Sequence, residues 1–242
     1  MATLLLRLAA PLQAWGVSSK FNIRMTGSEP SKSGVIGMIA AAMGRERSDS
    51  LEDLVELKFG VRKDQNGTLI KDYQTAHMTG QKDPFVTTRY YLADAVFLVG
   101  LEGGRAMLEE IDRAVRNPVF PLFLGRRSCP PTHPVSLGIV DFDLDDALRR
   151  HEWMASEWYK RKCGPEVSLE IISDAGVNEG HVMVRDRPLS FDQTYRRHAL
   201  RSARHDLNGV KVENKHGSRG RFETTHDAMS EIRRDARRTS PV

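Results

Sequence analysis

Residues 30–44, PSKSGVIGMIAAAMG, constrain the fold more than any other segment. From Val35 onward the run has no polar face, so it predicts a helix that is buried on every side. Ser31 or Ser33 could cap the start of this helix, where unpaired amides and the helix dipole favour an anion. With the charge of Lys32 beside them, the pattern predicts a cationic helix entrance that binds phosphate.

Two other interpretations of this segment are open. Residues 27–33 are close to the nucleotide-binding pattern G-x-x-x-x-G-K-[ST], but Ser31 replaces the second glycine and the spacing from Gly27 is one residue short. The preceding residues 21–25 alternate between apolar and polar like a half-exposed strand, whereas the strand before such a loop is buried on both faces. A nucleotide hydrolase is therefore disfavoured. A capped core helix with a merely solvated Lys32 is the second alternative.

Composition indicates a globular protein. The 242 residues are 40% hydrophobic and 28% charged, enough chain for one large domain or two small ones. No apolar run approaches about 18 residues, so we expect no membrane contact and a cytoplasmic location. The two cysteines, Cys129 and Cys163, do not suggest a disulfide framework. Cys129 and His133 could supply half of a zinc site, but no second pair has ligand spacing, so we expect neither metal nor cofactor.

Positive charge is concentrated near the C-terminal end. Residues 185–242 carry 14 Lys and Arg against 8 Asp and Glu, although the net charge of the whole chain is only +4. A basic excess of this kind favours a polyanionic partner. Few large apolar residues follow Val212, so residues 213–242 are predicted to form a mobile basic tail.

Hydrophobic patterning predicts an α+β order of elements. The polar residues 63–89, with a turn signal at Asn66-Gly67, predict a projecting hairpin between apolar strands. The expected strands cover 4–9, 55–62, 90–101 and 119–124, and the expected helices cover 35–43 and the segment after Gly103-Gly104. This order is close to the split βαβ pattern of ferredoxin-like folds, which include RNA-recognition modules.

Residues 1–140 are therefore expected to form a ferredoxin-like domain. Residues 141–212 are expected to form a smaller C-terminal subdomain. Its predicted elements are a helix over 145–161 and strands over 167–172 and 181–185.

Several blocks resemble one family. They are LLLRLAAPLQAWG at 4–16, PSKSGVIGMIAAAMG at 30–44, DYQT at 72–75, YYLADAVFLV at 90–99 and LGRRSCPPTHP at 124–134. In order and spacing they resemble the CasD family of type I-E CRISPR Cascade subunits, over about residues 3–140 and only loosely beyond. These proteins belong to the RAMP superfamily. The resemblance implies a ferredoxin-like, RRM-like domain with a thumb hairpin, here 63–89, and a smaller C-terminal part.

The resemblance also implies a function. Such a subunit is a non-catalytic RNA-binding protein that grips the 5′ handle of the CRISPR RNA and caps the backbone of the assembly in antiviral defence. Its implied partners are the CRISPR RNA, the backbone subunit CasC and the large subunit CasA, with target DNA reached through the complex. Cleavage of the RNA is implied to belong to the neighbouring CasE subunit.

The candidate RNA-binding residues combine cations for phosphates with flat rings for unstacked bases. They are Arg24, Lys32, Ser33, Tyr73, His77, Arg89, Arg126 and Arg127. Arg126 and Arg127 are adjacent and should point in opposite directions, so one could clamp RNA while the other pairs internally. The sequence leaves open which does which. Trp15 is either a stacking platform or a core residue, and the core is favoured.

The main alternative is a metal-independent endoribonuclease that processes CRISPR repeat RNA, as related RAMP proteins do. That reaction needs a base near a 2′-hydroxyl and a cation at the scissile phosphate. Lys71, Tyr73 and His77 could supply these groups. His77 lies further along the strand, however, and no second histidine or lysine is close in sequence, so binding without cleavage is favoured. A purely structural subunit is disfavoured by Lys32 and the Arg126-Arg127 pair.

Overall fold

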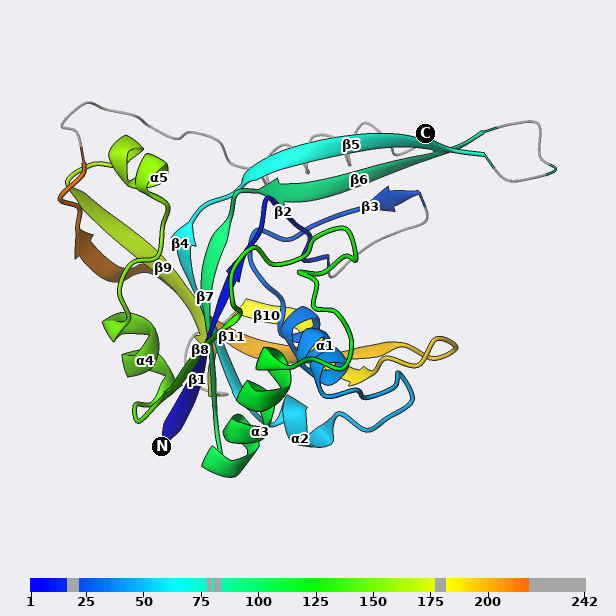
Figure 1. The fold of residues 1–242 in the computed structure, drawn as a ribbon, viewed down its shortest axis with the longest axis horizontal. Helices are drawn as coiled ribbons and strands as arrows, with labels where there is room; N and C mark the ends of the chain where they lie inside the picture. Colours follow the sequence, from blue (N-terminus) through cyan, green and yellow to red (C-terminus); the bar gives the residue numbers. More distant parts are fainter. Residues whose placement is uncertain (17–21, 78–79, 81–83, 177–181, 218–242) are drawn as a thin grey trace.

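The computed structural model describes residues 1–16, 22–77, 80, 84–176 and 182–217. A seven-stranded sheet forms its centre, and a smaller sheet lies at one end (Figure 1). In sheet order the large sheet contains β10 (Val182–Ser190), β11 (Arg197–Glu213), β9 (Glu166–Asp174), β4 (Lys58–Gln65), β7 (Val96–Gly103), β1 (Ala2–Ala9) and β8 (Ser136–Val140). The small sheet contains β2 (Leu12–Gln13), β6 (Phe85–Ala93) and β3 (Ile23–Arg24), with β5 (Thr68–Ala76) also paired to β6.

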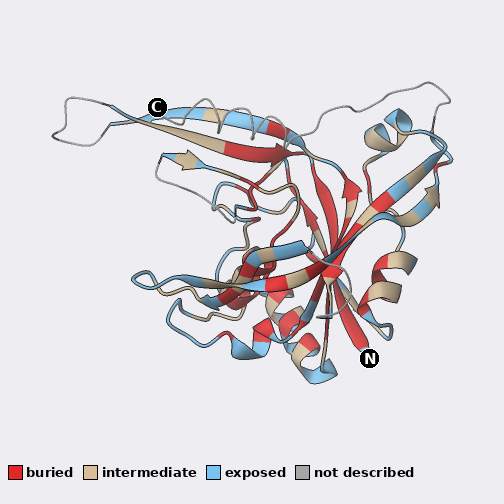
Figure 2. Ribbon diagram, turned by 180° about the vertical axis from the view of Figure 1, so that it is seen from behind, coloured by how far each residue is buried: buried red, intermediate tan, exposed pale blue. Residues whose placement is uncertain are grey.

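Helices cover both faces of the large sheet. The helices are α1 (Lys32–Ala42), α2 (Glu52–Val55), α3 (Arg105–Arg116), α4 (Leu144–Arg150) and α5 (Glu157–Lys162). Alternate residues of a strand point to opposite faces, and β1 shows the consequence. Leu4 and Leu6 pack into the main core with α1 and α3, whereas Leu5 packs into a smaller core with α4. Both faces of β1 are therefore buried, as the central strands of Figure 2 show.

The predicted buried helix is present as α1. Ser31 is its N-cap: the Ser31 hydroxyl accepts a hydrogen bond from the Gly34 amide at 3.2 Å. Val35, Ile36 and Ile39 have no exposed surface. The helix start is therefore fixed both by its cap and by the core behind it.

The predicted strand over 90–101 is divided in two. Asp94 adopts a positive φ of 56° between β6 and β7. Its amide donates to the carbonyl of Pro11 at 3.1 Å. This bend carries the chain from the small sheet into the large one, a change that apolar patterning does not signal.

Two predicted elements are wrong. Residues 119–124 do not form a strand, since Pro118 and Pro121 lack amide hydrogens and the side chains of Val119 and Phe120 are exposed. The strand that follows α3 is instead β8.

The predicted helix over 145–161 is broken into α4 and α5. The carbonyls of His151 and Glu152 accept hydrogen bonds of 2.7 and 2.8 Å from the buried guanidinium of Arg62. These carbonyls are bound by Arg62 and not by amides of a continuing helix, so α4 ends before them.

A projecting hairpin is present, with bounds that differ from the predicted 63–89. Strands β5 and β6 pair from Thr68↔Ala93 to Ala76↔Phe85 and extend away from the body (Figure 1). Lys63 and Gln65 belong to β4 and pair with β7 in the large sheet. The Asn66-Gly67 turn therefore joins two sheets and is not the turn of a hairpin.

The C-terminal strands β9, β10 and β11 continue the same sheet as β1, so the expected boundary near residue 140 falls within one sheet. Asn214, just after β11, is buried, and its side-chain amide donates to the carbonyls of Lys160 and Gly164. The first residues of the predicted mobile tail are thus held against α5. Residues 218–242 lie outside the described part of the chain. None of the described helices is long and apolar enough to cross a membrane.

Candidate nucleic-acid interface

An open pocket of about 360 Å³ lies where the start of α1 meets the small sheet. Four arginines line it: Arg24 from β3, Arg89 from β6, Arg126 from a loop, and Arg196 from just before β11. Among the described residues that form its walls, none is acidic. A positive pocket without carboxylates favours an anionic ligand.

Arg24 and Arg89 lie side by side, because β3 pairs with β6 in parallel and these two residues are partners in the register. In the described part of the chain, neither guanidinium has a hydrogen bond or an ion pair. Like charges on neighbouring strands repel each other. An anion between the two arginines would remove that repulsion.

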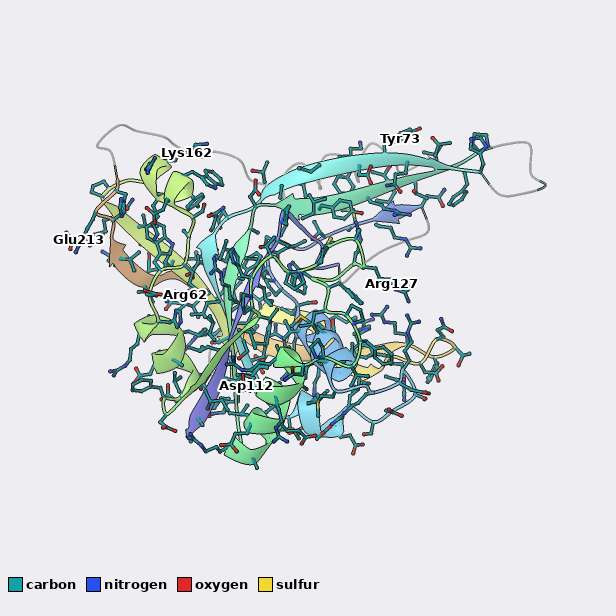
Figure 3. All side chains as sticks on the ribbon, viewed as in Figure 1. Arg62, Tyr73, Asp112, Arg127, Lys162 and Glu213 are labelled. Atoms are coloured by element: carbon teal, nitrogen blue, oxygen red, sulfur yellow. The ribbon has the colours of Figure 1, made fainter. Side chains whose placement is uncertain are left out.

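Tyr73 and His77 are not brought to this pocket. Tyr73 is opposite Thr88 in the hairpin, one position from the Asp72↔Arg89 pair, so Tyr73 and Arg89 lie on opposite faces. Tyr73 is 67% exposed, and Figure 3 shows it along the projecting hairpin. His77 is exposed beyond the end of β5.

The structure distinguishes the two adjacent arginines of the loop. Arg126 donates to the carbonyls of Tyr90 at 3.0 Å and Arg24 at 2.9 Å, and its guanidinium lies 4.6 Å from the centre of the Tyr91 ring. Arg127 is exposed and makes no hydrogen bond or ion pair with another described residue (Figure 3). Arg126 therefore fastens the loop to the small sheet, and Arg127 is free to bind a ligand.

Trp15 is part of the wall and core, not an exposed stacking surface. Its side chain is 1% exposed, and its indole N–H donates to the Gln13 side chain at 3.0 Å. Gly34 approaches this ring so closely that a Cβ there would lie 2.9 Å from it. Gly125 has a φ of 85°, and a Cβ on it would overlap the carbonyl oxygen of Ala14. These close approaches fix the shape of the pocket.

Comparisons with known proteins identify the family of this chain. A family model for the CRISPR-associated protein (Cas_Cas5) matches residues 3–204. The chain belongs to the Cas5 family of CRISPR-associated proteins. The match extends well beyond residue 140, where the sequence resemblance became loose.

Two solved structures and one relative make this Cas5 assignment more specific. The chain is 35% identical to CRISPR system Cascade subunit CasD of Escherichia coli (strain K12) over 184 residues, 66% of this chain and 81% of the relative. A crystal structure of a Cas protein matches with a TM-score of 0.66 and 37% identity, covering 90% of this chain and 98% of that one. A chain of a CRISPR RNA-guided surveillance complex matches with a TM-score of 0.72 and 30% identity, covering 96% and 99%. The predicted resemblance to CasD is confirmed.

The structure contradicts the predicted phosphate-binding role of Lys32 at the start of α1, and also the alternative of a solvated Lys32. Lys32 is 5% exposed, and its ammonium group donates to Asp174 at 2.9 Å and to the carbonyl of Leu57 at 2.8 Å. Its backbone amide donates to the carboxylate of Asp186 at 2.8 Å. An internal carboxylate therefore occupies the helix end where the sequence suggested a bound phosphate. We remove Lys32 from the set of RNA contacts.

The serines beside Lys32 remain at the pocket. Ser31 and Ser33 both line it, and their hydroxyl oxygens lie 3.4 Å apart. Ser31 is committed to capping Gly34, which leaves Ser33 as the more available hydroxyl. Of the eight predicted residues, Arg24, Ser33, Arg89 and Arg126 are thus brought together.

Sequence reasoning missed Arg196. It lies in the connection between β10 and β11 and stacks over Phe191 at 5.6 Å. Burial lowers the pKa of the nearby His198, and the Arg196 charge lowers it further, against the attraction of Asp186. The one local signal was the adjacent pair Arg196-Arg197 within the basic C-terminal region.

The structure gives no support to a zinc site at Cys129. Cys129 is buried, and burial raises the pKa of its thiol. Among the residues that the structure describes, no three His, Cys, Asp or Glu side chains are grouped so as to hold a metal ion.

Proposed function

We propose that this Cas5-family protein is a non-catalytic RNA-binding subunit of a Cascade-type complex, and that its arginine pocket grips the 5′ handle of the CRISPR RNA. The observation that carries the proposal is the side-by-side placement of Arg24 and Arg89, neither of which forms an ion pair with a described residue. Arg196 adds a third cation from another strand connection. The relatives named as a Cascade subunit and as part of an RNA-guided complex support the choice of RNA.

The chemistry suits a phosphate backbone. Guanidinium groups bind phosphate oxygens through paired N–H donors, and Ser33 can add a neutral donor. A volume of about 360 Å³ is within the range of ligand sites and leaves room for more than one phosphate oxygen. Arg127 lies outside this pocket and supplies a further contact with the RNA backbone.

We propose a ferredoxin-like arrangement for the strands and helices that hold this pocket. The sheet order β8-β1-β7-β4 is antiparallel throughout, with α1 between β1 and β4 and α3 between β7 and β8. This order supports the split βαβ topology. The hairpin of β5 and β6 then corresponds to the thumb, and its exposed Tyr73 and His77 face RNA or the neighbouring CasC subunit. CasA and target DNA are reached through the assembled complex.

The position of Tyr73 and His77 supports binding without cleavage. A metal-independent nuclease needs a general base and a phosphate-binding cation at one scissile bond. Tyr73 lies on the opposite face of the hairpin from Arg89, so the proposed base and the arginine pocket do not converge. The endoribonuclease alternative therefore has no specific observation in its favour.

Incubation with CRISPR repeat RNA in EDTA tests this proposal. We expect a shifted band with intact RNA, and the Arg24→Ala/Arg89→Ala variant should shift it less. An Arg113→Ala variant is the matched control, because Arg113 is exposed on α3 and does not line the pocket. Cleaved RNA would support the nuclease, and equal binding by both variants would remove the pocket from the interface.

A further inference from the structure

A buried network of four charged side chains joins the start of α1 to the three C-terminal strands. Arg201 of β11 donates to Asp186 of β10 at 2.6 and 3.1 Å and to Asp174 of β9 at 2.9 Å. Asp174 also accepts from the Lys32 ammonium, and Asp186 accepts from the Lys32 amide. Two cations and two anions thus close a ring across four elements.

Three members of this network are deeply buried, and the fourth, Asp174, is 20% exposed. The side chain of Asp186 is 1% exposed, and those of Lys32 and Arg201 are 6% and 8% exposed. Burial alone would lower the pKa of Arg201, but the two carboxylates raise it above its ordinary value. Removing one partner of a buried ion pair leaves an uncompensated charge, so the geometry of the ring depends on every member.

The network lies directly behind two walls of the arginine pocket. Lys32 is between Ser31 and Ser33, which both line the pocket. Arg201 is on β11, and the segment that leads into this strand carries the pocket residue Arg196. The same ionic contacts therefore hold the helix start and the strand connection at a fixed separation. No member of the network is itself a pocket-lining residue.

We propose that Lys32, Asp174, Asp186 and Arg201 are positioning residues, which set the distance between the α1 wall and the Arg196 wall of the pocket. This inference rests on the proposed function and assigns RNA recognition in part to the C-terminal strands. The network residues act through Ser33 and Arg196, and they make no contact with the RNA.

The test measures affinity for handle RNA and its salt dependence in Asp186→Asn. Coupling through a positioning network is typically worth a factor of about 2 to 30, so we expect affinity to fall by roughly that factor. The slope of log K against log salt should become shallower by at most about 0.7, the share of the single phosphate contact that a displaced Arg196 can lose. An affinity equal to that of the wild type would overturn the positioning role.

The matched control is Asp64→Asn. Asp64 pairs with Arg62 at 2.7 Å, both side chains have no exposed surface, and neither lines the pocket (Arg62 is labelled in Figure 3). This variant should lose stability but bind RNA as the wild type does when measured on folded protein. If Asp64→Asn and Asp186→Asn weaken binding equally, the effect is general destabilisation and the proposal is wrong.

Two further variants keep the test decisive. Asp174→Asn, at a partly exposed carboxylate, takes the place of Asp186→Asn if the latter does not fold. Arg24→Ala/Arg89→Ala tests the pocket itself. Normal binding by that double variant would refute the proposed function, whereas normal binding by the network variants alone would refute only the positioning role.

Discussion

Arg24 and Arg89 are register partners on parallel strands, and in the described structure neither guanidinium forms an ion pair, although Asp72 lies opposite Arg89 on β5. Charged pairs across strands are worth about 0.2 to 1 kcal/mol, with an unfavourable sign for like charges. The Arg24–Arg89 pair is therefore repulsive in the protein without ligand, and Asp72 offsets part of that repulsion. A polyanion bound between the two guanidinium groups is attracted by both and removes their repulsion, which favours binding.

One prediction follows for stability. Arg89→Gln should change the free energy of unfolding of the RNA-free protein by less than about 0.5 kcal/mol, because the repulsion from Arg24 and the attraction from the cross-strand Asp72 are both removed. The same variant should bind RNA less tightly. Chemical denaturation and RNA titration of one preparation measure both quantities. A clear loss of stability would show that Arg89 has a structural role.

Arg126 and Arg127 should give opposite results although they are adjacent. Arg126→Ala should lower the free energy of unfolding by about 1 to 2 kcal/mol, since it removes charged hydrogen bonds to two carbonyls. Arg127→Ala should change stability by less than about 0.5 kcal/mol and weaken RNA binding. Equal destabilisation by both variants in thermal melts would contradict this assignment.

Substitution of Gly125 and of Gly138 distinguishes the cost of backbone strain from the cost of a steric overlap. Both have a positive φ, of 85° and 99°, but only Gly125 lies against another backbone segment, at Ala14. Gly138→Ala should cost about 1 to 2 kcal/mol for strain alone. Gly125→Ala should cost more, because the added methyl group overlaps the Ala14 carbonyl. Similar unfolding midpoints for the two variants would disprove the close approach.

His198 should make stability depend on pH. Burial, assisted by Arg196, lowers its pKa in the folded protein, so the unfolded chain binds this proton more readily. Its contribution to stability is therefore present above about pH 6.5 and is lost as the pH falls toward the folded pKa. The difference between the melting temperatures at pH 5.5 and pH 7.5 should be smaller for His198→Gln than for the wild type. If this difference in melting temperature is the same in both proteins, His198 does not contribute to the pH dependence of stability.

The sequence predicted the elements whose cause is local. Helix α1 follows from an uninterrupted apolar run with Ser31 as its cap, and α3 from amphipathic spacing after Gly104. The absent strand at 119–124 also has a local cause, the two prolines, whereas the other errors arose where tertiary contacts decide. The bend at Asp94 and the helix break at His151 depend on partners distant in sequence, Pro11 and Arg62.

The site was predictable only in part for the same reason. Arg24 and Arg89 could be named as cations, but their juxtaposition requires the pairing of β3 with β6. Lys32 looked exposed because its acidic partners Asp174 and Asp186 are more than 140 residues away. Long-range ion pairs leave no local pattern, so a buried lysine and a phosphate-binding lysine look alike in sequence.

The salt dependence of handle-RNA binding shows whether the arginine pocket holds phosphate. For single-stranded RNA each phosphate contact contributes about 0.7 to the slope of log K against log salt. We expect Arg24→Ala/Arg89→Ala to bind more weakly and with a slope that is shallower by roughly 1.4, while Arg113→Ala keeps the slope of the wild type. An unchanged slope in a folded Arg24→Ala/Arg89→Ala protein would show that the pocket holds no phosphate.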